Sequence, residues 1–171
     1  MTLPTTVTVV GTDVELRRAT ADDLSGIVTM LADDPLGAER ETRDGDLAPY
    51  RRAFELVDGD PAHVLLVAVE GDELVGTLQL SVLPGLARRG ASRGQIEAVR
   101  VAAGARGRGL GAVLVGWAVE ECRRRGCALV QLTTDKSRTD ARRFYEQLGF
   151  VASHEGMKLA LPERQGSEPR R

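Results

Sequence analysis

A strand, a glycine-rich turn and a long helix follow one another in the middle of this chain, and this order constrains the fold more than any other feature. Residues 96–101 alternate like a β-strand, and residues 110–125 carry an apolar helical stripe. The stripe consists of Leu110, Val113, Leu114, Trp117 and Ala118. Residues 128–133 predict a buried strand next, so the centre of the chain is a strand–helix–strand unit of an α/β fold.

Strands and helices alternate over the rest of the 171 residues, and this length fits one domain. We expect a single domain over 1–171, with a core at about 14–161 and a frayed polar tail at 162–171. Further strands are predicted at 5–10, 14–18, 63–69, 74–83, 151–153 and 157–161. Further helices are predicted between Thr20 and Pro35, at 46–58 and at 140–148, and loops at 35–45 and 84–94.

The composition argues against several classes of protein. No apolar run approaches the roughly 20 residues that span a bilayer, and the first residues lack the features of a signal peptide. We therefore expect a cytoplasmic protein with no membrane partner. A net charge of −2 and only 4% aromatic residues argue against nucleic-acid binding. Cys122 and Cys127, with only His63 and His154 to join them, lack the spacing of a zinc site, so we expect reduced thiols and no metal.

Charge is unevenly distributed along the chain. Residues 1–60 contain 13 acidic and 6 basic side chains, whereas residues 61–171 contain 12 acidic and 17 basic ones. A basic second part suits a phosphate-rich ligand, and an acidic first part suits a cationic substrate. Ordinary surface composition explains the imbalance equally well, so both interpretations stay open.

The turn Arg106-Gly-Arg-Gly-Leu-Gly111 has the properties of an anion-binding site. Its glycines remove side chains where a ligand would approach the backbone. The turn opens directly into a helix, whose first N–H groups are unpaired and carry a partial positive charge. Arg106 and Arg108 add positive charge at the rim, so the segment is well suited to a diphosphate.

Two other phosphate-binding motifs fit this turn less well. A P-loop requires a lysine after its glycines, and no lysine lies near the turn. Gly107, Gly109 and Ala112 follow the spacing of a dinucleotide fingerprint, which normally lies in the first strand–helix turn of a domain and is followed by an acid about 20 residues later. Here the turn lies two-thirds of the way along the chain, and strand 128–133 ends in threonines. A nicotinamide-dependent oxidoreductase stays an alternative that NAD binding would reveal.

Two segments together resemble the signatures of the GNAT family of N-acetyltransferases. Arg106-x-x-Gly109-x-Gly111 matches the family's [QR]-x-x-G-x-[GA] motif, and Ala141-Arg-Arg-Phe-Tyr145-Glu-Gln-Leu-Gly-Phe150 resembles its A-x-x-F-Y-x-x-x-G-F segment. The segments occur in the family's order, and the resemblance extends from Val14 to about Leu161. It implies a three-layer α+β fold, with about four helices around a mixed, mostly antiparallel sheet of about seven strands that is splayed at its centre.

The resemblance also implies how acetyl-CoA, the co-substrate, is held. The backbone of strand 96–101 pairs with the pantetheine arm, and the glycine-rich turn holds the pyrophosphate. The implied cofactor-binding residues are Val99, Arg100, Val101, Arg106, Gly107, Arg108, Gly109, Leu110, Gly111 and Ala112. Many members carry asparagine seven residues before the tyrosine, where this chain has Arg138. Arg138 either reaches a CoA phosphate or is a solvated residue at a helix start.

Two side chains are candidates for acid–base chemistry. Tyr145 matches the tyrosine that often protonates the departing thiolate in this family, although a core tyrosine on an amphipathic helix is the alternative. Glu97 is the candidate general base, because an amine nucleophile is protonated at neutral pH and must lose a proton. Strand alternation predicts that Glu97 shares a face with Val99 and Val101, and a surface or salt-bridged acid is the alternative. His154 is either a substrate contact or a turn residue.

The sequence thus predicts an acetyl-CoA-dependent N-acetyltransferase that acts on a primary amine in a ternary complex. The acceptor is expected to be a small molecule such as a metabolite, a polyamine or an antibiotic. Acidic residues at 33–46 favour a cationic acceptor. A peptide or protein N-terminus, and a non-catalytic acyl-CoA-binding regulatory domain on the same fold, stay open as alternatives. Homodimers are common in the family.

Overall fold

The structure, a computed structural model, describes residues 2–33, 35–38, 41 and 45–161, so the predicted tail at 162–171 lies outside the described residues. Two compact units, Met1–Leu132 and Thr133–Arg171, make up the chain. The strands of the first unit are β1 (Thr5–Val9), β2 (Thr12–Arg18), β3 (His63–Glu70), β4 (Glu73–Leu83), β5 (Arg93–Val101) and β6 (Leu129–Leu132). Its α-helices are α1 (Leu24–Leu31), α2 (Pro35–Ala38), α3 (Ala48–Gly59), α4 (Ala87–Gly90) and α5 (Leu110–Arg124), and η1 (Ala21–Asp23) and η2 (Ala103–Ala105) are 3₁₀-helices.

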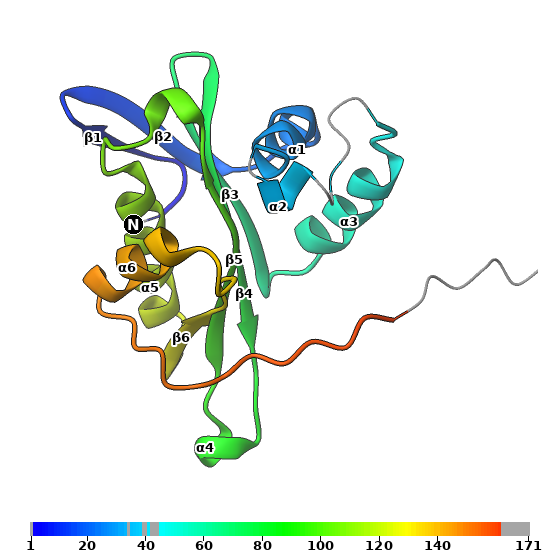
Figure 1. The fold of residues 1–171 in the computed structure, drawn as a ribbon, viewed down its shortest axis with the longest axis vertical. Helices are drawn as coiled ribbons and strands as arrows, with labels where there is room; N and C mark the ends of the chain where they lie inside the picture. Colours follow the sequence, from blue (N-terminus) through cyan, green and yellow to red (C-terminus); the bar gives the residue numbers. More distant parts are fainter. Residues whose placement is uncertain (1, 34, 39–40, 42–44, 162–171) are drawn as a thin grey trace, which may run out of the picture. The chain divides into compact units, whose positions relative to one another are not determined.

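The six described strands of the first unit form one sheet in the order β1-β2-β3-β4-β5-β6. Neighbours from β1 to β5 are antiparallel, and β5 and β6 are parallel because α5 crosses over between them. Helix α5 covers one face of the sheet, and α1 and α3 cover the other (Figure 1). The mixed, mostly antiparallel three-layer fold predicted from the sequence is confirmed, with six strands among the described residues where about seven were expected.

The sheet is splayed where β5 leaves β6. Residues 93–96 of β5 pair with Leu129–Leu132, and the pairing stops at Ile96. From Glu97 to Val101, β5 continues beside β4 alone among the described strands of this unit. Backbone N–H and C=O groups on that edge of β5 are therefore not used in a strand ladder. The splay that was expected at the centre of the sheet lies between β5 and β6, the last two strands of the described order.

Close packing joins α5 to the sheet at two glycines. A Cβ at Gly76 of β4 would come within 3.0 Å of the Leu114 side chain, and a Cβ at Gly94 of β5 would overlap Sγ of Cys122. On the other face, Ala19, Ile27 and Val67 form a buried cluster to which Leu31, Phe54, Leu65, Val69 and Leu74 add partly buried side chains. Both faces of β3 and β4 are thus covered, and these strands form the centre of the core.

Local hydrogen bonds and turns explain where several elements differ from their predicted bounds. Helix α3 begins at Ala48 rather than near Asp46, because Oδ1 of Asp46 accepts the N–H of Ala48. Strand β5 begins at Arg93, since its first residues pair with the end of β4. The predicted loop 84–94 contains α4, in which Arg88 and Arg89 have φ of 53° and 61°.

The second unit contains α6 (Thr139–Gln147) where a helix was predicted at 140–148. Gly149, with φ of 88°, ends the helix, and the N–H of Phe150 returns to the carbonyl of Tyr145. The strands predicted at 151–153 and 157–161 are wrong, because neither segment is in a strand. Alternating apolar side chains offer a face, but a strand also needs a second backbone. Val151, Met157, Leu159 and Leu161 are exposed instead.

None of the described helices has the length and apolarity needed to cross a membrane.

Candidate active site

The glycine-rich turn leads from η2 into the first turn of α5. Gly107 and Gly109 have φ of 76° and 86°, in the left-handed region that favours glycine, and Gly109 is the N-cap of the helix. A Cβ at either position would meet no atom within 4 Å, so space is open on the outside of the turn. The N–H groups of Ala112 and Val113 donate to the Gly109 carbonyl at 3.0 and 3.2 Å. The N–H groups that precede them are those that a helix leaves for a ligand or solvent.

Both arginines of the turn are held by carboxylates from other elements. Nη2 of Arg106 lies 2.8 Å from Oδ2 of Asp33, beyond the end of α1, and its Nε donates to the carbonyl of Val101 at 3.0 Å. Nη1 of Arg108 lies 2.9 Å from Oε2 of Glu70, the last residue of β3. The sequence predicted both arginines as positive charge at the rim of the turn, and the structure places an acid beside each of them.

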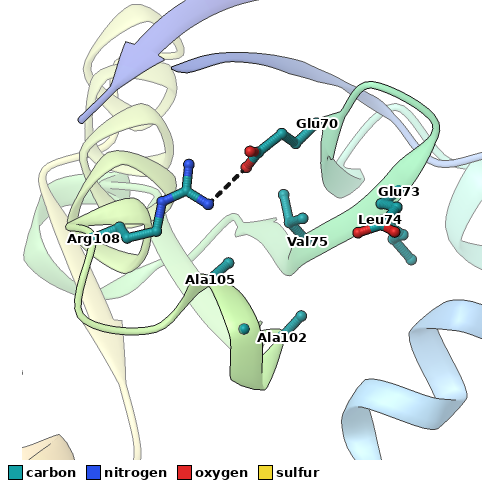
Figure 2. Close-up of a pocket in the computed structure, with 8 residues that line it drawn as sticks. Glu70, Glu73, Leu74, Val75, Ala102, Ala105 and Arg108 are labelled. Atoms are coloured by element: carbon teal, nitrogen blue, oxygen red, sulfur yellow. Dashed lines mark ion pairs between the residues drawn. The ribbon is translucent and has the colours of Figure 1, made fainter. Parts of the chain in front are cut away.

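A small cavity lies beside Arg108. Its volume is about 290 Å³, and residues from the β3–β4 turn, the start of β4 and the segment after β5 line it (Figure 2). The lining residues are Glu70, Glu73, Leu74, Val75, Ala102, Gly104, Ala105 and Arg108. Apolar side chains and the charged side chains of Glu70, Glu73 and Arg108 line it together, so this cavity is the immediate surrounding of the ion pair between Glu70 and Arg108.

A β-bulge at Ala98 breaks the regular pairing of β5 with β4. Gln79 pairs with Glu97, but Thr77 pairs with Arg100, so one residue of β4 lies opposite two residues of β5. Ala98 has φ of 53°, a conformation that costs an alanine about 1 kcal/mol. Backbone strain of this kind is frequent at functional sites.

The bulge changes which side chains share a face. Directly paired residues of antiparallel strands point to the same side, so Glu97 and Arg100 lie on one face, roughly 7 Å apart along the strand. Val101 pairs with Gly76, which faces α5, so Val101 lies on the opposite face. The prediction that Glu97 and Val101 share a face is therefore wrong, because the extra residue shifts the alternation by one.

Glu97 and Arg100 belong to the side of the sheet that α1 covers. The side chain of Glu97 is exposed, and that of Arg100 is half-buried, with Nη1 donating to the carbonyl of Val99 at 3.0 Å. Glu97 and Arg100 thus lie on the same face of β5, in the part of this strand that no described strand pairs with on its second edge. This arrangement suits a ligand that carries both a cationic and an anionic group.

Tyr145 belongs to the second unit, on α6. Its ring contacts Phe144 and Phe150 edge-on, at centroid distances of 5.1 and 5.9 Å. The side chain is half-buried, which suits either the predicted acid or a core residue. Arg138 is the N-cap of α6, and the Nδ1 atom of exposed His154 lies 2.8 Å from Oγ of Ser153.

The cysteines take no part in this chemistry. Burial raises the pKa of the Cys122 thiol to about 12, and the neighbouring thiol of Cys127 adds to the shift. Both cysteines are free, in line with the reduced thiols predicted from the sequence. No cluster of three or more histidine, cysteine or acidic side chains that could hold a metal ion occurs within the described ranges.

Sequence reasoning missed the two acids that engage the turn. Glu70 and Asp33 lie 38 and 73 residues before their arginine partners, and neither belongs to a recognisable motif. Only the fold brings them to the turn, because β3, β5 and the end of α1 meet at the same end of the sheet.

Comparison with known proteins agrees with this arrangement. The profile of the Acetyltransferase (GNAT) family matches residues 27–150. The chain is 31% identical to the aminoalkylphosphonate N-acetyltransferase of Salmonella typhimurium, over 86% of this chain and 91% of the relative. A solved structure from Bacillus halodurans C-125, described as a transcriptional regulator, is 50% identical with a TM-score of 0.83, over 86% of this chain and 99% of the other. A Trypanosoma brucei acetyltransferase is 30% identical with a TM-score of 0.72, over 87% of this chain and 100% of the other.

The family match spans the glycine-rich turn, the splayed strand and α6, and the overall fold agrees with that of the relatives. The chain belongs to the GNAT family of acetyltransferases.

Proposed function

We propose that this protein transfers an acetyl group from acetyl-CoA to the primary amine of a small molecule, by direct attack in a ternary complex. The observation that carries the proposal is the open glycine-rich turn at the start of α5, next to a strand whose edge is unpaired beyond Ile96. Such a turn binds a diphosphate, and such an edge pairs with the amide groups of a pantetheine arm. Membership of the GNAT family supports the same co-substrate.

The proposed chemistry assigns one proton transfer to each candidate residue. Glu97 accepts a proton from the ammonium group, and the free amine nitrogen attacks the thioester carbonyl. As the tetrahedral intermediate collapses, the new C–N bond is kept and the C–S bond breaks. The electron pair leaves with sulfur, and the phenol of Tyr145 gives the thiolate its proton. The attacking nitrogen loses its remaining extra proton through solvent to the Tyr145 phenolate, which leaves a neutral amide and restores the phenol.

The acceptor is proposed to be an amine that also carries an acidic group. Arg100 lies on the same face of β5 as Glu97, so its positive charge would attract the acidic group while the carboxylate of Glu97 accepts the proton of the amine. The Salmonella typhimurium relative, whose name specifies aminoalkylphosphonates, agrees with this acceptor class. The acidic first part of the sequence suggested an acceptor with cationic groups only, and this is the alternative to an amine that also carries an acidic group.

The decisive test is a CoA-release assay over a panel of amines. The panel contains 2-aminoethylphosphonate, amino acids, polyamines, aminoglycosides and short peptides. We expect the highest kcat/KM with the aminoalkylphosphonate, and one equivalent of thiol for each acetyl group transferred. Preference for a polyamine or a peptide would replace the acceptor proposal and leave the acetyltransferase proposal standing.

A second candidate function is regulatory binding of acyl-CoA without turnover. It is favoured by the 50% identity to a protein described as a transcriptional regulator. If acetyl-CoA binds tightly but no amine of the panel releases CoA, the regulatory function replaces the enzymatic one.

A further inference from the structure

The ion pair between Glu70 and Arg108 lies at a sensitive position of the turn. Arg108 separates Gly107 from Gly109, and both glycines have positive φ. Figure 2 shows the two charged side chains pointing toward each other at the edge of the cavity, with Glu70 coming from the end of β3. The side chain of residue 108 therefore ties the most flexible part of the turn to the sheet.

Burial makes this pair difficult to exchange for a pair with a ligand. The side chains of Arg108 and Glu70 are only 28% and 27% exposed. Oε2 of Glu70 is a buried atom without a hydrogen bond of good geometry in the part of the chain that the structure describes, so its charge is balanced by Nη1 of Arg108 at 2.9 Å. If Arg108 turned toward a bound diphosphate, that buried oxygen would lose its counter-charge, which is strongly unfavourable.

The backbone of the turn does not need the side chain of Arg108 as a ligand. The first N–H groups of α5 already supply donors and a partial positive charge. These donors require a fixed direction. The glycines on either side of Arg108 leave that direction poorly defined unless the side chain of Arg108 is held.

We propose that Glu70 and Arg108 are a positioning pair. Arg108 braces the glycine-rich turn against the end of β3, so that the backbone N–H groups converge on the diphosphate, and its guanidinium does not bind the phosphates. The proposal rests on the proposed function in one respect, namely that the ligand of the turn is CoA or acetyl-CoA.

The two possible roles of Arg108 predict opposite effects of a change at Glu70. If Arg108 braces the turn, Glu70→Gln weakens CoA binding as Arg108→Gln does. If Arg108 is a phosphate ligand that Glu70 restrains, Glu70→Gln releases it and tightens CoA binding. Glu73 is the matched control, because it lines the same cavity and has no ion pair with Arg108.

The experiment measures the Kd of CoA by isothermal titration calorimetry for the full-length protein and its variants, with Tm recorded for each. We expect Glu70→Gln and Arg108→Gln each to raise the Kd of CoA roughly three- to tenfold. The Kd of the double variant should not exceed the higher of the two single-variant values. Glu73→Gln is expected to leave Kd unchanged. With an active amine, KM for acetyl-CoA should rise while KM for the amine stays constant, which a general loss of folding would not produce.

Several outcomes overturn the proposal. These are tighter binding by Glu70→Gln, an effect of Arg108→Gln without one of Glu70→Gln, full additivity in the double variant, or no effect of either change. If Glu70→Gln does not fold, Glu70→Asp keeps the charge at a shorter reach and should give an intermediate Kd, and a wild-type Kd for it overturns the proposal. If the wild type does not bind CoA, the proposed function fails and the brace fails with it, whereas a CoA-binding wild type with tighter Glu70→Gln overturns the brace alone.

Discussion

Glu97 is the residue whose removal tests the proposed proton acceptance most directly. Its carboxylate is exposed beside the bulge, so it can meet an incoming ammonium group. General-base catalysis contributes about 10²- to 10⁴-fold, so we expect Glu97→Gln to lower kcat/KM at pH 7 by about 10²-fold or more. The loss should shrink as pH approaches about 10, where alkylamines lose their proton without help.

A pH–rate profile of the wild type and of Glu97→Gln measures this effect. The matched control is Gln95→Ala, which removes a side chain from the same strand without changing its charge. A loss that is the same at every pH would show that Glu97 positions the substrate and does not accept its proton.

Tyr145→Phe removes the phenolic hydroxyl and keeps the ring that packs edge-on against Phe144 and Phe150. If the hydroxyl protonates the thiolate, kcat should fall roughly 10- to 10³-fold while the Kd of CoA stays constant. Steady-state kinetics and a CoA titration on the same variant separate the two quantities. An unchanged kcat would identify Tyr145 as a packing residue.

Two residue-scale features could not be predicted from the sequence, for different physical reasons. Ala98 adopts a left-handed conformation that glycine would have signalled, so the pattern of 96–101 gave no sign of the bulge. Arg106 and Arg108 were predicted as positive charge at the rim of the turn without their acidic partners, since a local motif reveals a side chain but not the distant acid that pairs with it. The expected position of Glu97 on the face of Val101 depended on the regular strand alternation, whereas its proposed role as a base also rests on its residue type.

At the scale of elements, the packing of α5 on β5 depends on one glycine. A Cβ at Gly94 would overlap Sγ of Cys122, whose side chain is fully buried. We therefore expect Gly94→Ala to lower the free energy of unfolding by about 1–3 kcal/mol. The double variant Gly94→Ala/Cys122→Ala should recover part of this loss, because the new methyl group takes space that the thiol leaves.

Urea denaturation of the single and double variants measures the coupling. Gly116→Ala is the control on the same helix, because a Cβ there meets no atom within 4 Å and α-helical alanine is favoured over glycine by about 1 kcal/mol. It should be neutral or stabilising. Full additivity of the changes at positions 94 and 122 would mean that the helix moves away from the strand and that the two side chains do not compete.

Prediction succeeded best for elements whose signals are local. The stripe of α5 and its flanking glycines gave that helix almost to the residue, and the hairpin of β3 and β4 followed from two apolar runs around a turn. The segments at 151–153 and 157–161 failed because pairing is a property of two backbones, and the sequence of one segment reports only its own apolar pattern.

At the scale of the whole molecule, ligand binding should be visible as stability. A ligand that binds only the folded chain raises Tm in proportion to the logarithm of its concentration above Kd. We expect acetyl-CoA and CoA to raise Tm and NAD to leave it unchanged, which a thermal-shift titration measures. A rise with NAD and none with acetyl-CoA would favour a dinucleotide site over the proposed one.

The stability of the molecule against acid should depend on two carboxylates that join its elements. Hydrogen bonds from Arg17 hold the pKa of Asp23 below its ordinary value and connect β2 to the start of α1. Hydrogen bonds from Arg124, and then from Arg125, hold the pKa of Glu121 below its ordinary value, although burial acts in the opposite direction. Arg125 also donates to the carbonyl of Pro61, so this cluster connects the end of α5 to the start of β3.

A carboxyl group with a lower pKa in the folded chain than in the unfolded chain stabilises the fold when it is ionised. Its contribution is complete above the unfolded pKa, about 4, and disappears as the pH falls through the folded value. Tm should therefore be constant from pH 7 to about 5 and fall steeply below about 4. Glu121→Gln should lower the free energy of unfolding at pH 7 by about 1–2 kcal/mol and lower Tm accordingly. It should also make the decrease of Tm between pH 5 and 3 smaller than in the wild type. Glu120→Gln, which removes an exposed partner of Arg123 on the same helix, should change neither. A Glu121→Gln variant whose Tm falls with pH as steeply as the wild type would show that other carboxylates govern the acid unfolding of the molecule.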